Sequence, residues 1–201
     1  MTIHPIRCGA RLLLRVLGWT LDVERPLEPR GVVIVYPHTS NWDFVIGYLA
    51  KVAAGLPLQW IGKDSLFRWP FGGLLRRMGG VPVCRGARAG FVGELAREFA
   101  ARERLWIAIA PEGTRAHTDH WKSGFYHLAL AARVPIGLAA IDWGRRRVEF
   151  RRTLQLSGDP EVDLRSIRAF YGSVRGRRPE RAGAIRFPDR ERPPWAAPGP
   201  S

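Results

Sequence analysis

The chain has 201 residues, which fits one domain and is long enough to bury a core. Its formal net charge of +14 suits nucleic acid, an anionic membrane surface or phosphorylated substrates, so the charge does not choose between them. Two cysteines without zinc-site spacing, and the lack of about 18 unbroken apolar residues, exclude a disulfide framework and a spanning helix.

Residues 1–22 predict an N-terminal amphipathic helix. Arg7, Arg11 and Arg15 recur at four-residue intervals, with leucines largely elsewhere around the helix. This composition is typical of a helix that lies on a membrane surface, but it equally suits a helix that packs its leucines on the core. The segment 66–80 mixes aromatics, arginines and glycines, and it has the same two interpretations.

Apolar runs then alternate with helical segments over residues 23–171. This alternation predicts a single α/β domain with a mixed, mostly parallel sheet flanked by helices. A turn after residue 142 predicts that residues 147–151 pair antiparallel with 136–141. Residues 172–201 are rich in Arg, Pro and Gly, which predicts a basic, disordered tail. The predicted strands are 32–36, 57–61, 80–84, 105–109 and 135–141, and the predicted helices are 41–54, 87–103, 122–133 and 161–171.

A histidine and a carboxylate follow the first of these strands. His38 comes two residues after it and Asp43 five residues later. Ligands of open α/β sheets bind at the carboxyl ends of strands. A neutral His38 whose Nδ1–H is held by Asp43 would present Nε2 as a base toward a hydroxyl. The alternative is structural, because Ser40 and Asp43 also form a capping-box pattern.

A second polar segment, Pro111–Arg115, follows the strand predicted at 105–109. Its turn can direct backbone N–H groups outward, and Arg115 adds a planar fork for an anion. Arg85 follows a third strand, so three strand ends meet at one edge with two guanidinium groups. The alternative is an ordinary polar turn.

Together these segments resemble the glycerophospholipid acyltransferase family, whose best-known members acylate 1-acylglycerol 3-phosphate. Four segments match in the family's order over roughly residues 32–137, about half of the chain. Pro37, Cys84 and Ala110 depart from residues that family members often have, which indicates an outlying branch and leaves the acceptor open. The matching segments are His38-x4-Asp43, Lys63 through Arg85, Pro111–Arg115 with Lys122-x-Gly124, and Val134-Pro135-Ile136.

The resemblance implies that residues 23–171 form an acyltransferase domain. The domain would move an acyl group from a coenzyme A or acyl-carrier-protein thioester to a hydroxyl of a lysophospholipid or glycerol phosphate-type acceptor. No metal, other cofactor or covalent enzyme intermediate is implied. The enzyme would lie on the cytoplasmic face of the cell membrane, as a peripheral protein on an anionic surface.

The same resemblance assigns roles to individual residues. His38 would be the general base and Asp43 would orient it. A phosphate would be held by Arg85 and Arg115, and the oxyanion by Lys63 or a backbone N–H near Gly113. The implied substrate-binding residues are Lys63, Arg85, Glu112, Gly113, Thr114 and Arg115.

Other functions stay open at this point. A basic nucleic-acid-binding protein is favoured by Arg175-Gly-Arg-Arg178, although no helix-turn-helix or RNP-like pattern accompanies it. An acyltransferase with a non-phospholipid acceptor and a thiol hydrolase that uses Cys84 with His38 are further alternatives.

Overall fold

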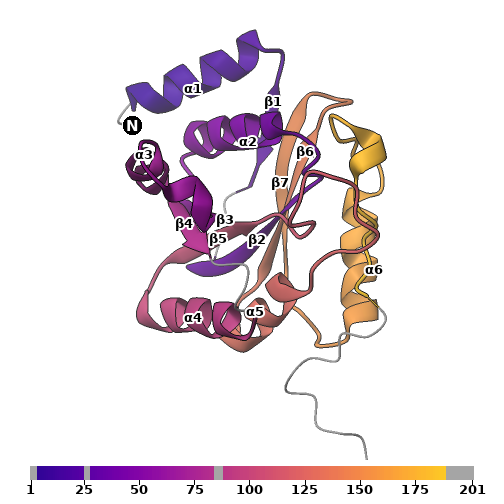
Figure 1. The fold of residues 1–201 in the computed structure, drawn as a ribbon. Coiled ribbons are helices and arrows are strands. Elements are labelled where there is room, and N and C mark those ends of the chain that lie inside the picture. The colour runs from indigo at the N-terminus through magenta and orange to yellow at the C-terminus, as the bar shows by residue number, and fades with distance from the viewer. Residues whose placement is uncertain (1–3, 25–27, 84–87, 189–201) are drawn as a thin grey trace, which may run out of the picture.

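The computed structural model describes residues 4–24, 28–83 and 88–188. These residues fold into a seven-stranded sheet with helices on both of its faces (Figure 1). The order β1-β7-β6-β2-β5-β3-β4 is parallel except for the antiparallel β6–β7 pair, which confirms the predicted mixed, mostly parallel α/β sheet. The strands are β1 (Thr20–Val23), β2 (Arg30–Tyr36), β3 (Leu58–Lys63), β4 (Gly80–Val83), β5 (Leu105–Ile109), β6 (Ile136–Asp142) and β7 (Arg147–Leu154).

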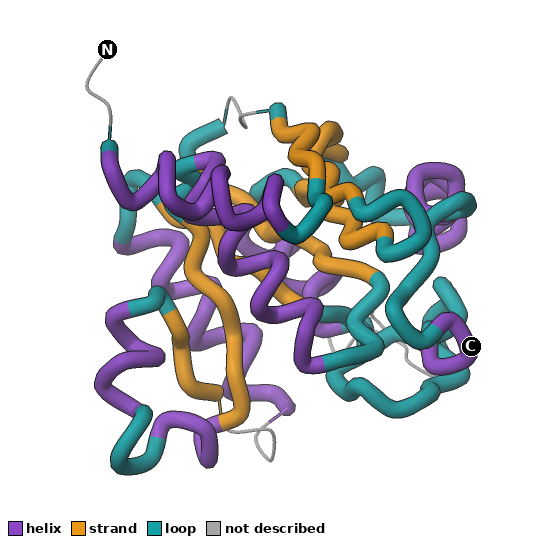
Figure 2. Tube along the Cα trace, turned by 90° about the horizontal axis from the view of Figure 1, so that it is seen from above, coloured by secondary structure: helices purple, strands orange, loops and turns teal. Residues whose placement is uncertain are grey.

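Viewed from above, the strands run through the middle of the molecule between the helices (Figure 2). Each predicted helix is present within a few residues of its expected bounds. The helices are α1 (Pro5–Val16), α2 (Asn41–Ala54), α3 (Gly72–Arg77), α4 (Arg88–Ala101), α5 (Gly124–Ala132) and α6 (Pro160–Tyr171), with short 3₁₀ turns η1 (Asp64–Phe67) and η2 (Pro179–Arg181).

The central strand β2 is buried on both faces, as its unbroken apolar run predicts. Val32 and Ile34 are fully buried in a core that includes side chains of α4, α5 and α6. Side chains of a strand alternate between the two faces, so Val33 joins Trp106 and Phe150 on the other face. This rigid centre fixes the carboxyl end of β2, where His38 begins the candidate site.

The N-terminal helix α1 lies on the outer side of α2, away from the sheet (Figure 1). Ala10 and Leu14 are buried against α2, and Arg11 Nε donates a hydrogen bond of 3.0 Å to the carbonyl of Ala53 at the end of α2. The helix is shorter than predicted because Gly18, at a φ of 76°, turns the chain into β1. The apolar side chains of α1 that stay exposed are Ile6, Leu12, Leu13 and Val16.

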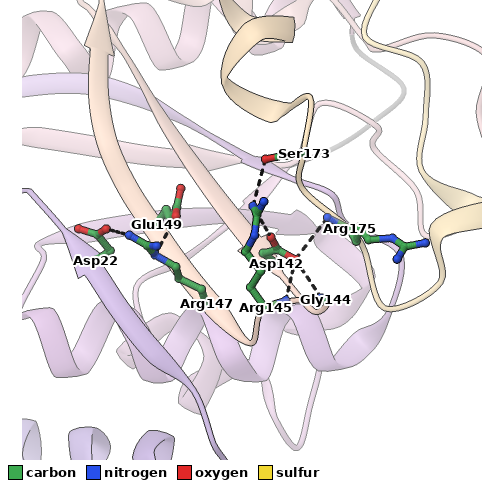
Figure 3. A network of polar contacts seen from close by, with 8 residues as sticks. All are labelled: Asp22, Asp142, Gly144, Arg145, Arg147, Glu149, Ser173 and Arg175. Carbon is green, nitrogen blue, oxygen red and sulfur yellow. Dashed lines mark hydrogen bonds and ion pairs between the residues drawn. The ribbon is translucent and has the colours of Figure 1, made fainter.

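Strand β1 does not appear in the sequence-based prediction, because it has no apolar run. It pairs in parallel with β7 at the edge of the sheet. Asp22 of β1 binds the guanidinium groups of Arg147 and Arg151. Arg147 also binds Glu149 at 2.8 Å, and Figure 3 shows the contacts of Arg147 with Asp22 and Glu149. Charge pairs between strands far apart in the sequence therefore hold this edge.

The structure differs from the prediction of a disordered tail over residues 172–188. This part of the chain, called here the return segment, runs back along the domain after α6 (Figure 1). The ring of Phe187 lies 5.4 Å from that of Tyr126, and the backbone N–H of Trp121 donates to the carbonyl of Arg186 at 2.8 Å. Buried apolar contacts thus order a segment of basic composition. Residues 189–201 lie outside the described residues.

Candidate active site

The two polar segments expected at the strand ends meet in the structure. Strands β2 and β5 are parallel neighbours, so their carboxyl ends lie side by side. Glu112 Oε2 accepts a hydrogen bond of 2.6 Å from the backbone N–H of His38, and Oε1 accepts one of 2.8 Å from Gly183. Burial raises the pKa of this carboxyl group, which is only 1% exposed. Glu112 therefore holds the backbone of the site through both of its carboxylate oxygens.

Asp43 caps α2 and also lies close to the imidazole of His38, without a hydrogen bond between the two side chains. Its Oδ2 accepts from the backbone N–H groups of Thr39 and Ser40, each at 2.7 Å, and so completes the capping box of α2. The same oxygen lies 3.9 Å from Nδ1 of His38. Trp143 Nε1 donates to Oδ1 at 2.7 Å. Burial raises the pKa of Asp43, while these three donors act to lower it.

The electrostatic surroundings keep His38 neutral. Burial lowers its pKa to about 4, and the positive charge of Arg115 acts in the same direction. A fraction of 18% of the side chain remains exposed, so the imidazole is accessible to a reactant. At neutral pH the ring is therefore a free base, as general-base catalysis requires.

The turn that follows β5 uses its small residues for its own structure. Gly113 has a φ of 64°, and a Cβ there would lie 2.9 Å from side-chain atoms of Lys122. Its N–H donates to the carbonyl of Ala110 at 3.1 Å, so this donor is already engaged. Thr114 is exposed, and its Oγ1 accepts from Ala116 N at 3.1 Å. These contacts shape the turn that carries Arg115.

The predicted site residues that remain, Arg115, Lys63 and Arg85, lie at separate places in the chain's fold or outside the described residues. Arg115 is exposed and lines a cavity beside the start of α2. Lys63 is exposed at the end of β3, which neighbours β5. Arg85 and Cys84 lie outside the described residues, and β4 ends at Val83.

The return segment brings residues into the site that sequence reasoning misses. The backbone N–H of Arg178 donates to Thr39 Oγ1 at 3.2 Å, and the Tyr36 hydroxyl donates to the carbonyl of Gly183 at 3.1 Å. Gly176 packs against Thr39, where a Cβ would approach Oγ1 to 3.0 Å. The available signal is a group of apolar side chains within the basic stretch, namely Ala182, Ile185 and Phe187, which pack on the core.

Asp142, at the end of β6, holds the start of the return segment (Figure 3). This residue is only 3% exposed, and its Oδ1 accepts from the backbone N–H groups of Gly144 at 2.9 Å and of Arg175 at 3.4 Å. Two residues on, the Arg177 guanidinium lies 5.0 Å from the ring centre of Trp143, in cation–π geometry. The return segment is thus tied to the residue that also binds Asp43.

A cavity of about 400 Å³ opens at the start of α2, where its lining begins at Thr39, the residue after His38; neither His38 nor Asp43 is among the lining residues. It is lined by residues 39–42 and by three arginines, Arg115, Arg178 and Arg181. The site therefore combines a neutral base, a buried carboxylate and a strongly positive cavity.

Comparison with known proteins agrees with this arrangement. A family model described as Acyltransferase matches residues 21–141, more than half of the chain. The chain is 27% identical over 150 residues to the 1-acyl-sn-glycerol-3-phosphate acyltransferase of Escherichia coli (strain K12), which covers 70% of this chain and 60% of that protein. The Salmonella typhimurium protein of the same name is 29% identical over 134 residues, 62% of this chain and 53% of that one.

The chain thus spans between half and two thirds of the length of these relatives. The fold is also similar to that of the 1-acyl-sn-glycerophosphate (LPA) acyltransferase of Thermotoga maritima, with a TM-score of 0.56 and 17% identity over 82% of this chain and 75% of the other. The motifs of this chain also follow the family's order and meet at one sheet edge. The match to the family model places this chain in the Acyltransferase family.

Proposed function

We propose that the protein transfers a fatty acyl group from an acyl thioester to a hydroxyl of a lysophospholipid or glycerol phosphate-type acceptor, with His38 as general base. The observation that carries this proposal is the accessible, neutral imidazole held beside a buried carboxylate at the sheet edge. The names of the relatives support a phosphate-bearing acceptor. Family membership favours this function over the nucleic-acid alternative.

The chemistry needs only groups that the chain provides. His38 Nε2 takes the proton of the acceptor hydroxyl as its oxygen attacks the thioester carbonyl carbon, and Asp43 stabilises the resulting imidazolium. The tetrahedral intermediate then expels the thiolate, which receives the proton back from His38. An ester bond forms, the thioester bond breaks, and the enzyme is unchanged. The reaction as proposed uses no metal and no covalent enzyme intermediate.

The oxyanion of the tetrahedral intermediate requires a donor. The candidates are Lys63, at the end of β3, and a backbone N–H near Gly113; the N–H of Gly113 itself already binds the carbonyl of Ala110. The proposed acyl donor is a thioester, either of coenzyme A or of an acyl carrier protein. Arg115 contacts the phosphate of a substrate.

We further propose peripheral attachment to an anionic membrane, on its cytoplasmic face. None of the helices in residues 4–24, 28–83 and 88–188 has the length and apolar character needed to cross a membrane. The exposed apolar side chains of α1 are joined by others around α3, while Arg68, Arg76 and Arg77 are also exposed there. Apolar groups beside arginines suit a surface of anionic headgroups. The exposed side chains around α3 are Leu66, Trp69, Phe71 and Leu74.

An acyl-transfer assay tests the reaction. Purified protein is given a panel of lysophospholipids with acyl-coenzyme A or acyl carrier protein, and His38→Ala is compared with the exposed-site control His117→Ala. We expect His38→Ala to lose about 10²–10⁴ in rate and the control to keep its activity. Full activity in His38→Ala would contradict the mechanism. Absence of transfer by the wild type, with DNA binding retained in His38→Ala, would favour the nucleic-acid alternative.

A further inference from the structure

The cavity at the start of α2, whose lining begins one residue after His38, is positively charged. Of the side chains that line it, those of Arg115, Arg178 and Arg181 are cationic, and no lining residue among the described ones is acidic. Arg115 belongs to the motif after β5, whereas the other two come from the return segment. Three arginines from two distant parts of the chain thus line one cavity.

The return segment is held in place by its backbone. The N–H of Arg178 donates to the buried Thr39, and five residues later the N–H of Gly183 donates to the buried Glu112. Between these anchors, the 3₁₀ turn η2 is closed by a hydrogen bond of 2.9 Å from Arg181 N to the carbonyl of Arg178. Because backbone groups make these contacts, they leave the side chains of Arg178 and Arg181, both lining residues of the cavity, uncommitted to the anchors.

Internal carboxylates neutralise little of this charge. Among the described residues, neither Arg115 nor Arg178 forms an ion pair. Arg181 lies 4.0 Å from Glu180, whose side chain is 69% exposed, and such a surface pair is weak. The field of Arg115 reaches His38, where it lowers the pKa. Like charges gathered in one cavity repel each other unless an anion binds between them.

We propose that Arg178 and Arg181, together with Arg115, bind a phosphate group of a substrate next to the reacting hydroxyl. The guanidinium fork suits the oxygens of a phosphate, and several forks around one cavity suit a dianion. The return segment therefore supplies part of the substrate-binding site. The identity of the phosphate's carrier rests on the acyltransferase function proposed above, whereas the anion site itself does not.

Calorimetric binding at low salt tests the site without turnover. The probes are two matched pairs: sn-glycerol 3-phosphate with glycerol, and coenzyme A with pantetheine. The wild type is compared with Arg178→Gln/Arg181→Gln, and Arg165→Gln on α6 is the control, because it removes an exposed arginine outside the cavity. We expect the double variant to bind at least one phosphate-bearing probe about tenfold more weakly or worse, and the control to bind like the wild type.

The pairs also identify the source of the phosphate. A loss confined to sn-glycerol 3-phosphate assigns the site to the acceptor, and a loss confined to coenzyme A assigns it to the donor. In the transfer assay, the double variant should show a raised KM for the same substrate and an unchanged KM for its phosphate-free partner. Thermal unfolding of the variant close to that of the wild type shows that the anchors persist.

Two results would overturn the proposal. One is undiminished binding of both phosphate-bearing probes by the double variant, or no binding of either by the wild type. The other is an equal loss of activity with phosphate-bearing and phosphate-free substrates. Absence of acyl transfer by a wild type that binds phosphate through these arginines would contradict the proposed function and leave the anion site standing.

Discussion

The backbone N–H of His38 donates a hydrogen bond of 2.6 Å to the carboxylate of Glu112, which comes 74 residues later in the sequence. This bond joins the carboxyl ends of β2 and β5. The second oxygen of Glu112 binds Gly183, so three distant parts of the chain meet at one buried side chain.

Replacing Glu112 should therefore disturb the position of His38. In Glu112→Gln, the amide group presents N–H to one of two backbone donors, so one buried hydrogen bond is lost. We expect the free energy of unfolding to fall by about 1–3 kcal/mol and kcat to fall with it. Urea unfolding and acyl transfer measure the two effects. The matched control is Glu94→Gln on the exposed side of α4. Wild-type stability and activity in Glu112→Gln would contradict the role of Glu112 in positioning His38.

The titration of His38 should depend on Arg115. Burial and the Arg115 charge together lower the pKa to about 4. Removing the charge in Arg115→Gln favours the imidazolium, so the pKa of His38 should rise toward 6.5. It should not reach that value, because the side chain stays buried. NMR titration of the imidazole measures this without substrate.

The acid limb of kcat/KM should follow the same shift, since the neutral ring is the active form. Activity of Arg115→Gln should therefore decline at a higher pH than that of the wild type. Arg165→Gln serves as the control for a general change in net charge. An unchanged His38 midpoint in Arg115→Gln would show that the charge of Arg115 does not act on the ring.

Trp143 should act on catalysis through Asp43. In Trp143→Phe the ring remains, but the 2.7 Å hydrogen bond to Asp43 Oδ1 is lost. The pKa of Asp43 should rise, and its hold on the imidazolium should weaken. We expect a several-fold lower kcat with little change in KM, and a loss of about 1 kcal/mol in unfolding free energy. An unchanged kcat in Trp143→Phe, with the loss of stability present, would contradict the assignment.

The return segment should be required for both stability and activity. A chain that ends at residue 188 retains every contact described above and should behave like the wild type. A chain that ends at residue 174 loses two backbone donors to buried oxygens and the packing of Phe187. We expect it to lose about 3 kcal/mol or more of stability, along with its activity. Chemical unfolding and transfer assays of both chains check this, and equal behaviour of the two would contradict it.

Local patterns predicted most of the sheet and the two central motifs. The apolar run before His38 identified β2 because a strand buried on both faces needs apolar side chains at successive positions. The order of motifs then predicted which strand ends lie together. Asp43 was open to two interpretations: the structure shows the helix cap and places Asp43 Oδ2 3.9 Å from Nδ1 of His38, while its role toward the histidine stays a prediction.

Contacts between distant residues were not predictable in the same way. Strand β1 depends on Asp22 and its pairs with arginines of β7, and no local pattern encodes that partnership. The composition of the return segment predicts disorder, yet Glu112 and Thr39 supply the acceptors that order it. Glu112 was expected among the substrate-binding residues, but its two oxygens bind backbone donors.

The hydrogen bond between Gly183 and Glu112 also sets an order of events during synthesis. Until the ribosome has released the residues up to about Gly183, the Glu112 carboxylate has only one of its two backbone donors, that of His38. The cavity then has only Arg115 of its three arginines. A nascent chain with both sequence motifs complete would thus still have an unfinished site. Under the proposed function, the site is therefore completed late, once Gly183 has bound Glu112.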